Sequence, residues 1–245
     1  MHRFYAPDIG PAGTAAPLPP EEAQHLIRVL RLSLGENIRV FDGRGREHAA
    51  TVEALTKTEA IVRLGEAVPA AAESPVTITL AMALLKADKF DEVVRDATML
   101  GVGRIQPIAT SRTEVPAART SRVDRWRRIA VSSAKQCGRA VVPPIEEPIT
   151  FSEFVAQPVA ERLLMLAEPG LADAISTREL GSGPPPASAA LLVGPEGGWS
   201  DAEHRLAMEC NATLVNLGSR TLRAETAPLV ILAVLEHLWG GAISR

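Results

Sequence analysis

Residues 191–200 read LLVGPEGGWS, a short apolar run that breaks into a glycine-rich turn. Residues 201–210 (DAEHRLAMEC) then follow a helical pattern, so this stretch predicts a strand, a turn and a helix in succession. Ser200 and Glu203 have the spacing of a capping box, in which the two side chains satisfy the free amides at a helix start. A buried strand that leads into a helix is the repeating unit of a parallel sheet.

The turn lies where open parallel sheets bind ligands, beyond the carboxyl end of a strand. Its glycines allow positive φ angles and a close approach of the backbone to a ligand. It lacks both the GxxxxGK[ST] pattern of a phosphate loop and the GxGxxG pattern of a dinucleotide loop, and Glu196 would repel phosphate. The turn therefore favours a ligand whose contacting part is neutral or positively charged, such as an adenosine moiety. Alternatively, the turn is only a tight connection between the strand and the helix.

Two other predicted strands also end in polar loops. Residues 164–170 (LMLAEPG) place a carboxylate just after one strand, and residues 216–226 (NLGSRTLRAET) form a longer, charged loop after another. If the three strands are neighbours, these loops would converge on one crevice and form a pocket.

From Val76 onward, short apolar runs alternate with longer segments of helical periodicity. This alternation predicts an α/β domain with a mostly parallel sheet that is covered on both faces. The predicted strands are residues 76–84, 104–108, 162–167, 189–193 and 213–217, and the predicted helices are residues 86–100, 121–137, 201–210 and 227–239.

The first part of the chain has a different pattern. Pro19 and Pro20 open a helical pattern that ends before Gly35. Alternating runs over residues 37–41, 47–54 and 60–64 predict a small antiparallel sheet or barrel. Residues 68–75, rich in alanine and proline, are the expected linker, which gives predicted domains of residues 1–73 and 74–245.

The predicted final helix has no polar face over residues 229–235 (LVILAVL). A helix of this kind must be buried on all sides. Either the core of one chain or contact with a second subunit satisfies this requirement, and the pattern alone does not distinguish them.

The composition is that of a globular protein, because 46% of the 245 residues are hydrophobic. We find neither a membrane span, which needs about 18 uncharged apolar residues, nor a signal-peptide core, so we expect a cytoplasmic protein. Cys137 and Cys210 lie far apart without a CxxC partner, which predicts neither a disulfide framework nor a zinc site. The histidines have no metal-ligand spacing, so we expect no metal.

The formal net charge of −3 argues against a protein that coats nucleic acid through bulk positive charge. The charge is uneven, however, because residues 112–139 contain eight basic and two acidic side chains. This basic segment is either a phosphate-contacting patch or a solvated helix face.

Five segments together resemble one known family. GPEGGWSDAE (194–203) and LGSRTLRAETA (217–227) are similar to the paired signature of the SPOUT methyltransferases. HLIRVLRLSLGE (25–36), KADKFDEVVRDATMLGV (86–102) and SSAKQCGRAVVPPI (132–145) extend the similarity to the RsmE family, which methylates N3 of a uridine in bacterial small-subunit ribosomal RNA. Met99 and Lys135 depart from this family's pattern, since relatives usually carry glutamate at both positions.

The resemblance implies an α/β SPOUT domain with a deep trefoil knot, preceded by a small PUA-like β-barrel that helps to hold RNA. It also implies a homodimer that binds S-adenosylmethionine (SAM) in the knot and acts on 16S ribosomal RNA, either free or in the assembled 30S particle. A homodimer would place the apolar final helix at an interface.

The resemblance and the chemistry of methyl transfer together suggest site residues. Uridine N3 must lose its proton before it attacks, and Arg223 is the expected cation that stabilises the resulting charge, with Glu225 orienting the arginine or accepting the proton. RNA contacts are expected from Arg3, Arg31, Gln136 and Arg139. The expected cofactor-binding residues are Leu166, Glu168, Gly194, Glu196, Gly197, Gly198, Leu217, Gly218, Leu222 and Ala227, with Leu166 and Leu217 on either side of the adenine.

Two other functions remain open at this point. The cofactor motifs do not fix the acceptor atom, so a related knotted enzyme could methylate a ribose 2′-hydroxyl or a guanine nitrogen. A catalytically silent RNA-binding assembly factor could also keep this fold, although Arg223 and Glu225 are intact.

Overall fold

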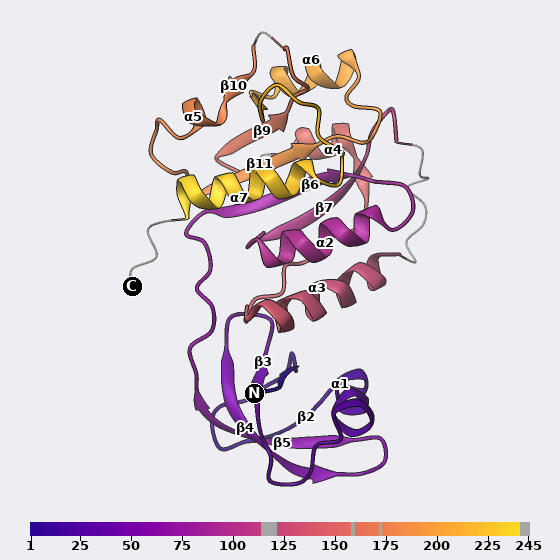
Figure 1. The fold of residues 1–245 in the computed structure, drawn as a ribbon, viewed down its shortest axis with the longest axis vertical. Coiled ribbons are helices and arrows are strands. Elements are labelled where there is room, and N and C mark those ends of the chain that lie inside the picture. The colour runs from indigo at the N-terminus through magenta and orange to yellow at the C-terminus, as the bar shows by residue number, and fades with distance from the viewer. Residues whose placement is uncertain (114–121, 158–159, 172, 241–245) are drawn as a thin grey trace. The chain divides into compact units, whose positions relative to one another are not determined.

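A computed structural model describes residues 1–113, 122–157, 160–171 and 173–240 of the chain (Figure 1). Internal contacts divide the chain into two compact units. The first comprises Met1–Glu73 together with Val131–Val142, and the second comprises Ser74–Ala130 and Pro143–Arg245. The first unit is therefore discontinuous along the chain, a feature that the sequence pattern does not reveal.

The first unit contains a five-stranded sheet. Its central strands pair antiparallel, which confirms the small antiparallel sheet predicted from the alternating runs. An edge strand pairs in parallel with its neighbour and was not predicted. The sheet order is β1 (Arg3–Tyr5), β3 (Asn37–Phe41), β4 (Glu47–Leu55), β5 (Ala60–Ala67) and β2 (Ala15–Pro17).

The helical pattern before Gly35 forms two short elements in place of one helix. α1 (Pro20–Gln24) runs directly into a π-helix, η1 (His25–Leu30), which ends at Arg31 in a left-handed conformation with φ of 54°. Leu26 is fully buried in the core of this unit, whereas Val29 is 68% exposed. π-Turns of this kind occur frequently at functional positions.

Arg3 ties the first strand to the end of α3 (Val123–Cys137). Its guanidinium donates hydrogen bonds to the carbonyl oxygens of Ala134, Lys135 and Arg139 over 2.8–3.0 Å. It also pairs with the buried carboxylate of Glu47 at 2.8 Å. A cation at a helix C-terminus satisfies carbonyls that have no partner within the helix, so Arg3 has a structural role in this unit.

The second unit contains a seven-stranded sheet in which every strand pairs in parallel with its neighbours. This confirms the parallel α/β sheet predicted from the alternation of apolar runs and helical segments. The order across the sheet is β10 (Ile175–Ser176), β12 (Thr213–Asn216), β9 (Arg162–Leu166), β11 (Ser188–Val193), β6 (Thr77–Ala83), β7 (Arg104–Ala109) and β8 (Ile149–Thr150).

Helices cover both faces of this sheet, as Figure 1 shows. α2 (Lys89–Met99) and α7 (Ala227–Trp239) contact each other, and so do α4 (Phe151–Val155) and α6 (Asp201–Glu209). Ala190 and Leu192 pack into one cluster with residues of α4 and α6, so Leu191 and Val193 point to the opposite face. None of the helices in the described part of the chain has the length and apolar character that a membrane crossing needs.

The short helices of the second unit begin with capping boxes. Ser200 and Glu203 form the predicted box at α6, and Thr150 and Glu153 form another at α4. A third box starts α5 (Thr177–Leu180). The box at α6 has an additional partner, because Glu203 also accepts hydrogen bonds from the amide and hydroxyl of Ser111 at 2.7 and 3.1 Å. Glu203 therefore connects the loop after β7 to the helix that follows the glycine turn.

Replacement of Glu203 by glutamine is expected to lower the free energy of unfolding by about 1–2 kcal/mol at pH 7, because charge-assisted hydrogen bonds are lost. Burial raises the pKa of Glu203, but hydrogen bonds from Ser200 and Ser111 outweigh burial and hold the pKa below its ordinary value. The carboxylate therefore contributes stability above its unfolded-state pKa of about 4.3 and loses it as the pH falls through the lower folded-state pKa. Urea denaturation at pH 7 and in acid measures the difference.

Glu153→Gln is the matched control, because its capping box lies on an exposed helix start. We expect the smaller loss of stability there. Equal losses in the two variants would show that the bonds to Ser111 contribute nothing.

Candidate functional site

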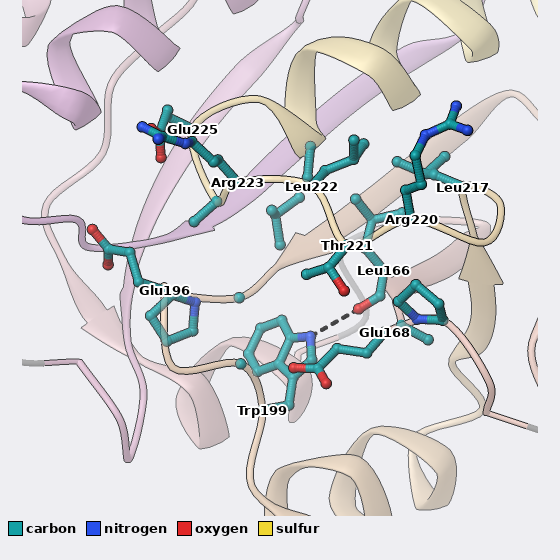
Figure 2. A pocket seen from close by; sticks show the side chains of 18 of the residues that line it. Leu166, Glu168, Glu196, Trp199, Leu217, Arg220, Thr221, Leu222, Arg223 and Glu225 are labelled. Atoms are coloured by element: carbon teal, nitrogen blue, oxygen red, sulfur yellow. Dashed lines mark hydrogen bonds and ion pairs between the residues drawn. The ribbon is translucent and has the colours of Figure 1, made fainter.

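Three loops meet at the carboxyl ends of adjacent strands in the second unit (Figure 2). They follow β9, β11 and β12, which the sheet order places side by side. Together they enclose a cavity of about 290 Å³. This volume is just below the range of roughly 300–1,000 Å³ that is typical of small-molecule sites. The cavity lies at the edge of the sheet where such ligands bind.

The glycine turn after β11 forms one wall of the cavity. Gly198 has a φ of 68°, and a Cβ atom there would collide with the carboxylate of Glu168. A Cβ atom on Gly194 would lie 3.1 Å from the ring of Trp199. Gly197 faces away from the cavity, since its carbonyl accepts a hydrogen bond from Arg112 at 2.8 Å and it is absent from the cavity wall.

Trp199 fixes the turn against the neighbouring strand. Its indole nitrogen donates a hydrogen bond of 2.9 Å to the carbonyl oxygen of Leu166, at the end of β9 (Figure 2). The side chain is buried and also lines the cavity. Sequence reasoning did not select Trp199, although a large aromatic residue inside a polar turn is a signal that could have revealed it.

The loop before α7 forms the opposite wall. Leu217, Leu222 and Ala227 line the cavity as expected, and so do Arg220 and Thr221, which were not selected. Gly218 has a φ of 107°, and its amide donates a hydrogen bond of 3.2 Å to the side chain of Asn216, so the chain turns sharply as β12 ends. Leu166, Leu217 and Leu222 contribute apolar side chains to the lining of the cavity (Figure 2).

Four charged side chains form a chain of contacts beside the cavity. The ammonium group of Lys89 lies 3.1 Å from a carboxylate oxygen of Glu196 and 3.4 Å from one of Glu225. Glu225 in turn lies 3.8 Å from the guanidinium of Arg223, whose side chain is 84% exposed. The structure therefore joins the predicted pair Arg223 and Glu225 to Glu196 through Lys89, which sequence reasoning did not select.

These contacts change the protonation properties of two of the groups. Burial raises the pKa of Glu196, but hydrogen bonds from its own amide, the ammonium of Lys89 and the amide of Lys86 lower it below its ordinary value. The pKa of Lys89 is raised, chiefly by its hydrogen bond to Glu196. The negative charge of Glu196 is therefore compensated by the ammonium group of Lys89.

The residues expected to contact RNA fall into two groups. Arg3 is mostly buried and Arg139 is 4% exposed, and their guanidinium groups pair with Glu47 and Glu73 respectively. Arg31 and Gln136 are exposed. The internal pairing of Arg3 and Arg139 favours structural roles for them, whereas Arg31 and Gln136 are accessible to a partner.

The basic segment 112–139 is partly neutralised within the structure. Arg125 pairs with Asp91, Arg127 pairs with Asp124, and Lys135 pairs with Glu22. Arg119 lies outside the described residues. The described residues contain no group of three or more His, Cys, Asp or Glu side chains arranged to hold a metal ion.

Comparison with known proteins identifies the class. Residues 72–236 match the family described as RNA methyltransferase domain, and residues 18–65 match the family described as RNA methyltransferase PUA domain. The fold and the three-loop cavity thus belong to an RNA methyltransferase that carries a PUA domain.

Individual relatives narrow the class to one family. A ribosomal RNA small subunit methyltransferase E from Synechocystis is 38% identical over 89% of this chain and 71% of its own. The crystal structure of a ribosomal RNA small subunit methyltransferase E from Neisseria gonorrhoeae bound to SAM is 36% identical, with 98% of each chain covered and a TM-score of 0.88. A Legionella pneumophila methyltransferase in complex with SAM is 32% identical, with 96% of each chain covered and a TM-score of 0.89. The chain belongs to the ribosomal RNA small subunit methyltransferase E family, which confirms the resemblance seen in the sequence.

Proposed function

We propose that the protein uses SAM to methylate N3 of a uridine in small-subunit ribosomal RNA. The observation that carries this proposal is the cavity formed by the three loops, in a chain whose family and fold match relatives that bind SAM. The match to an RNA methyltransferase PUA domain supports an RNA substrate.

The cavity wall fits the parts of SAM. Leu166, Leu217 and Leu222 offer an apolar surface for the adenine, and the glycine turn allows the backbone to approach closely. Glu168, Gly194, Gly218 and Ala227 complete the proposed contacts. Bound SAM supplies an activated methyl group, so the protein needs chiefly to position the acceptor. Gly197 supports the turn from outside through its hydrogen bond with Arg112 and is not assigned a direct contact.

The charged residues act on the uridine. Arg223 is exposed beside the cavity, where a bound nucleotide would cover it and exclude water. Its guanidinium would then stabilise the charge that develops on the carbonyl oxygens flanking N3. Glu225 lies close to both Arg223 and Lys89. This position supports a role in orienting the arginine and makes a role as proton acceptor the weaker alternative.

Each unit offers its own candidates for contact with RNA. Arg31 and Gln136 are the accessible candidates in the first unit, and Arg220 is an exposed candidate beside the cavity. Arg3 and Arg139 would support the first unit through their internal pairs and not touch RNA directly.

Three further features are part of the proposal. The last segment of the α/β domain threads through a loop and so forms a deep trefoil knot, as the family resemblance implies. α7 packs against a second copy of the chain, which is supported by its apolar residues that remain exposed, such as Val230 at 37%. The enzyme acts in the cytoplasm, where small ribosomal subunits are assembled, on free RNA or the assembled particle.

Methylation of RNA with labelled SAM tests the function. The purified protein is incubated with deproteinised 16S ribosomal RNA and, separately, with unmethylated small subunits, and the digested nucleosides are separated. We expect the label in 3-methyluridine. Label in a ribose-methylated nucleoside or in methylguanosine would show that the acceptor is a ribose hydroxyl or a guanine and not uridine N3. RNA binding without any label would indicate a silent assembly factor.

A further inference from the structure

Lys89 is the first residue of α2 and comes from none of the three loops that build the cavity. It nevertheless lines the cavity and contacts the carboxylates of Glu196 and Glu225, which belong to two of those loops. Among the described residues, Oε2 of Glu225 is buried without a hydrogen-bond partner. The ammonium group at 3.4 Å is therefore the positive charge that offsets this oxygen.

We propose that Lys89 is a positioning residue that sets the charge of the cavity and thereby its preference between SAM and the product S-adenosylhomocysteine (SAH). This inference rests on the proposed function of the same site. The two ligands differ in their electrostatic interaction with the cavity, because SAM carries a positive sulfonium and SAH carries a neutral sulfur.

The charge balance of the cavity depends on Lys89. With the lysine present, Glu196 is paired, and Glu225 lies between Lys89 and Arg223. Without it, Glu196 would lose its ion pair with Lys89, and the carboxylate that lies beside Arg223 is that of Glu225, at 3.8 Å. The cavity would then attract a sulfonium more strongly and leave a neutral sulfur almost unaffected.

The same balance affects the reaction rate. Methyl transfer removes the positive charge from the sulfur, so excess negative charge in the cavity stabilises the reactants more than the transition state. It would also oppose loss of the proton from uridine N3. Lys89 reduces both effects and holds Glu225 beside Arg223.

Titration calorimetry with SAM and with SAH tests this role. In Lys89→Met we expect SAM to bind more tightly relative to SAH, so that the ratio of the SAH Kd to the SAM Kd rises by about tenfold. This is the size of effect expected when one nearby charge is lost from a partly solvated site. The single-turnover rate should fall by a similar factor. Lys89→Arg keeps the charge and should restore the ratio to that of the unaltered protein. Arg95→Met removes an exposed cation from the same helix and should leave the ratio unchanged.

The double variant Lys89→Met with Glu196→Gln separates charge from structure. Because it removes one positive and one negative group, it should return the ratio close to that of the unaltered protein. An unchanged ratio in Lys89→Met, or an equal loss of affinity for SAM and SAH, would overturn the inference about Lys89. In either case, SAM binding by the unaltered protein would still uphold the proposed function. Failure of the unaltered protein to bind SAM would instead overturn the proposed function and this inference with it.

Discussion

Replacement of Arg223 by alanine is expected to reduce methyl transfer severely while the Kd for SAM changes by no more than about threefold. The loss of turnover should be on the order of 10²–10³, which is the effect of removing one preorganised donor from a developing charge. The selective effect follows from position, because the guanidinium is largely exposed beside the cavity and would face the RNA. Single-turnover rates and calorimetry measure the two quantities separately.

Two variants control this result. Arg223→Lys keeps the charge but lacks the planar fork, so we expect a partial loss. Arg205→Ala removes an exposed arginine from α6 and should retain full turnover. Parallel losses of turnover and SAM affinity in Arg223→Ala would show that the arginine binds the cofactor and does not stabilise the acceptor.

Replacement of Gly198 by valine is expected to lower the affinity for SAM by at least tenfold, or about 1.4 kcal/mol. A β-branched residue strongly disfavours the φ of 68° that Gly198 adopts, at a cost of about 1–3 kcal/mol. The new side chain would also displace Glu168 at the cavity wall. Calorimetry with SAM gives the affinity.

Gly13→Val is the matched control for backbone strain. Gly13 has a φ of 85° in the first unit, and a Cβ atom there would meet nothing within 4 Å. We expect a loss of stability without a change in SAM affinity. Normal SAM binding by Gly198→Val would mean that the turn does not form the cofactor wall.

The strands of the second unit could be predicted because each is a buried apolar run. β6, β9, β11 and β12 lie within two residues of their predicted bounds. β8 and β10 have two residues each and are too short for any period to appear. The capping boxes of α4 and α5 are readable in the sequence, so those two helices could have been found.

The site was predictable where its residues lie in local motifs. The three loops after β9, β11 and β12 were each visible as polar segments after apolar runs. Lys89 was not, because its partner Glu196 is 107 residues away and only the sheet order brings them together. The internal pairs of Arg3 and Arg139 were hidden for the same reason. The π-helix was hidden too, because a helical period does not reveal the width of each turn.

The discontinuity of the first unit affects when it can fold during synthesis. Arg3 donates hydrogen bonds to the carbonyl oxygens of Ala134, Lys135 and Arg139. The buried side chain of Phe41 packs with Ala134 and Ala140. These partners leave the ribosome only after β6, α2 and β7 of the second unit have been made. The amino-terminal domain of this ribosomal RNA methyltransferase thus cannot finish folding as soon as its first 73 residues have left the ribosome. Its last contacts must form after part of the catalytic domain has already been translated.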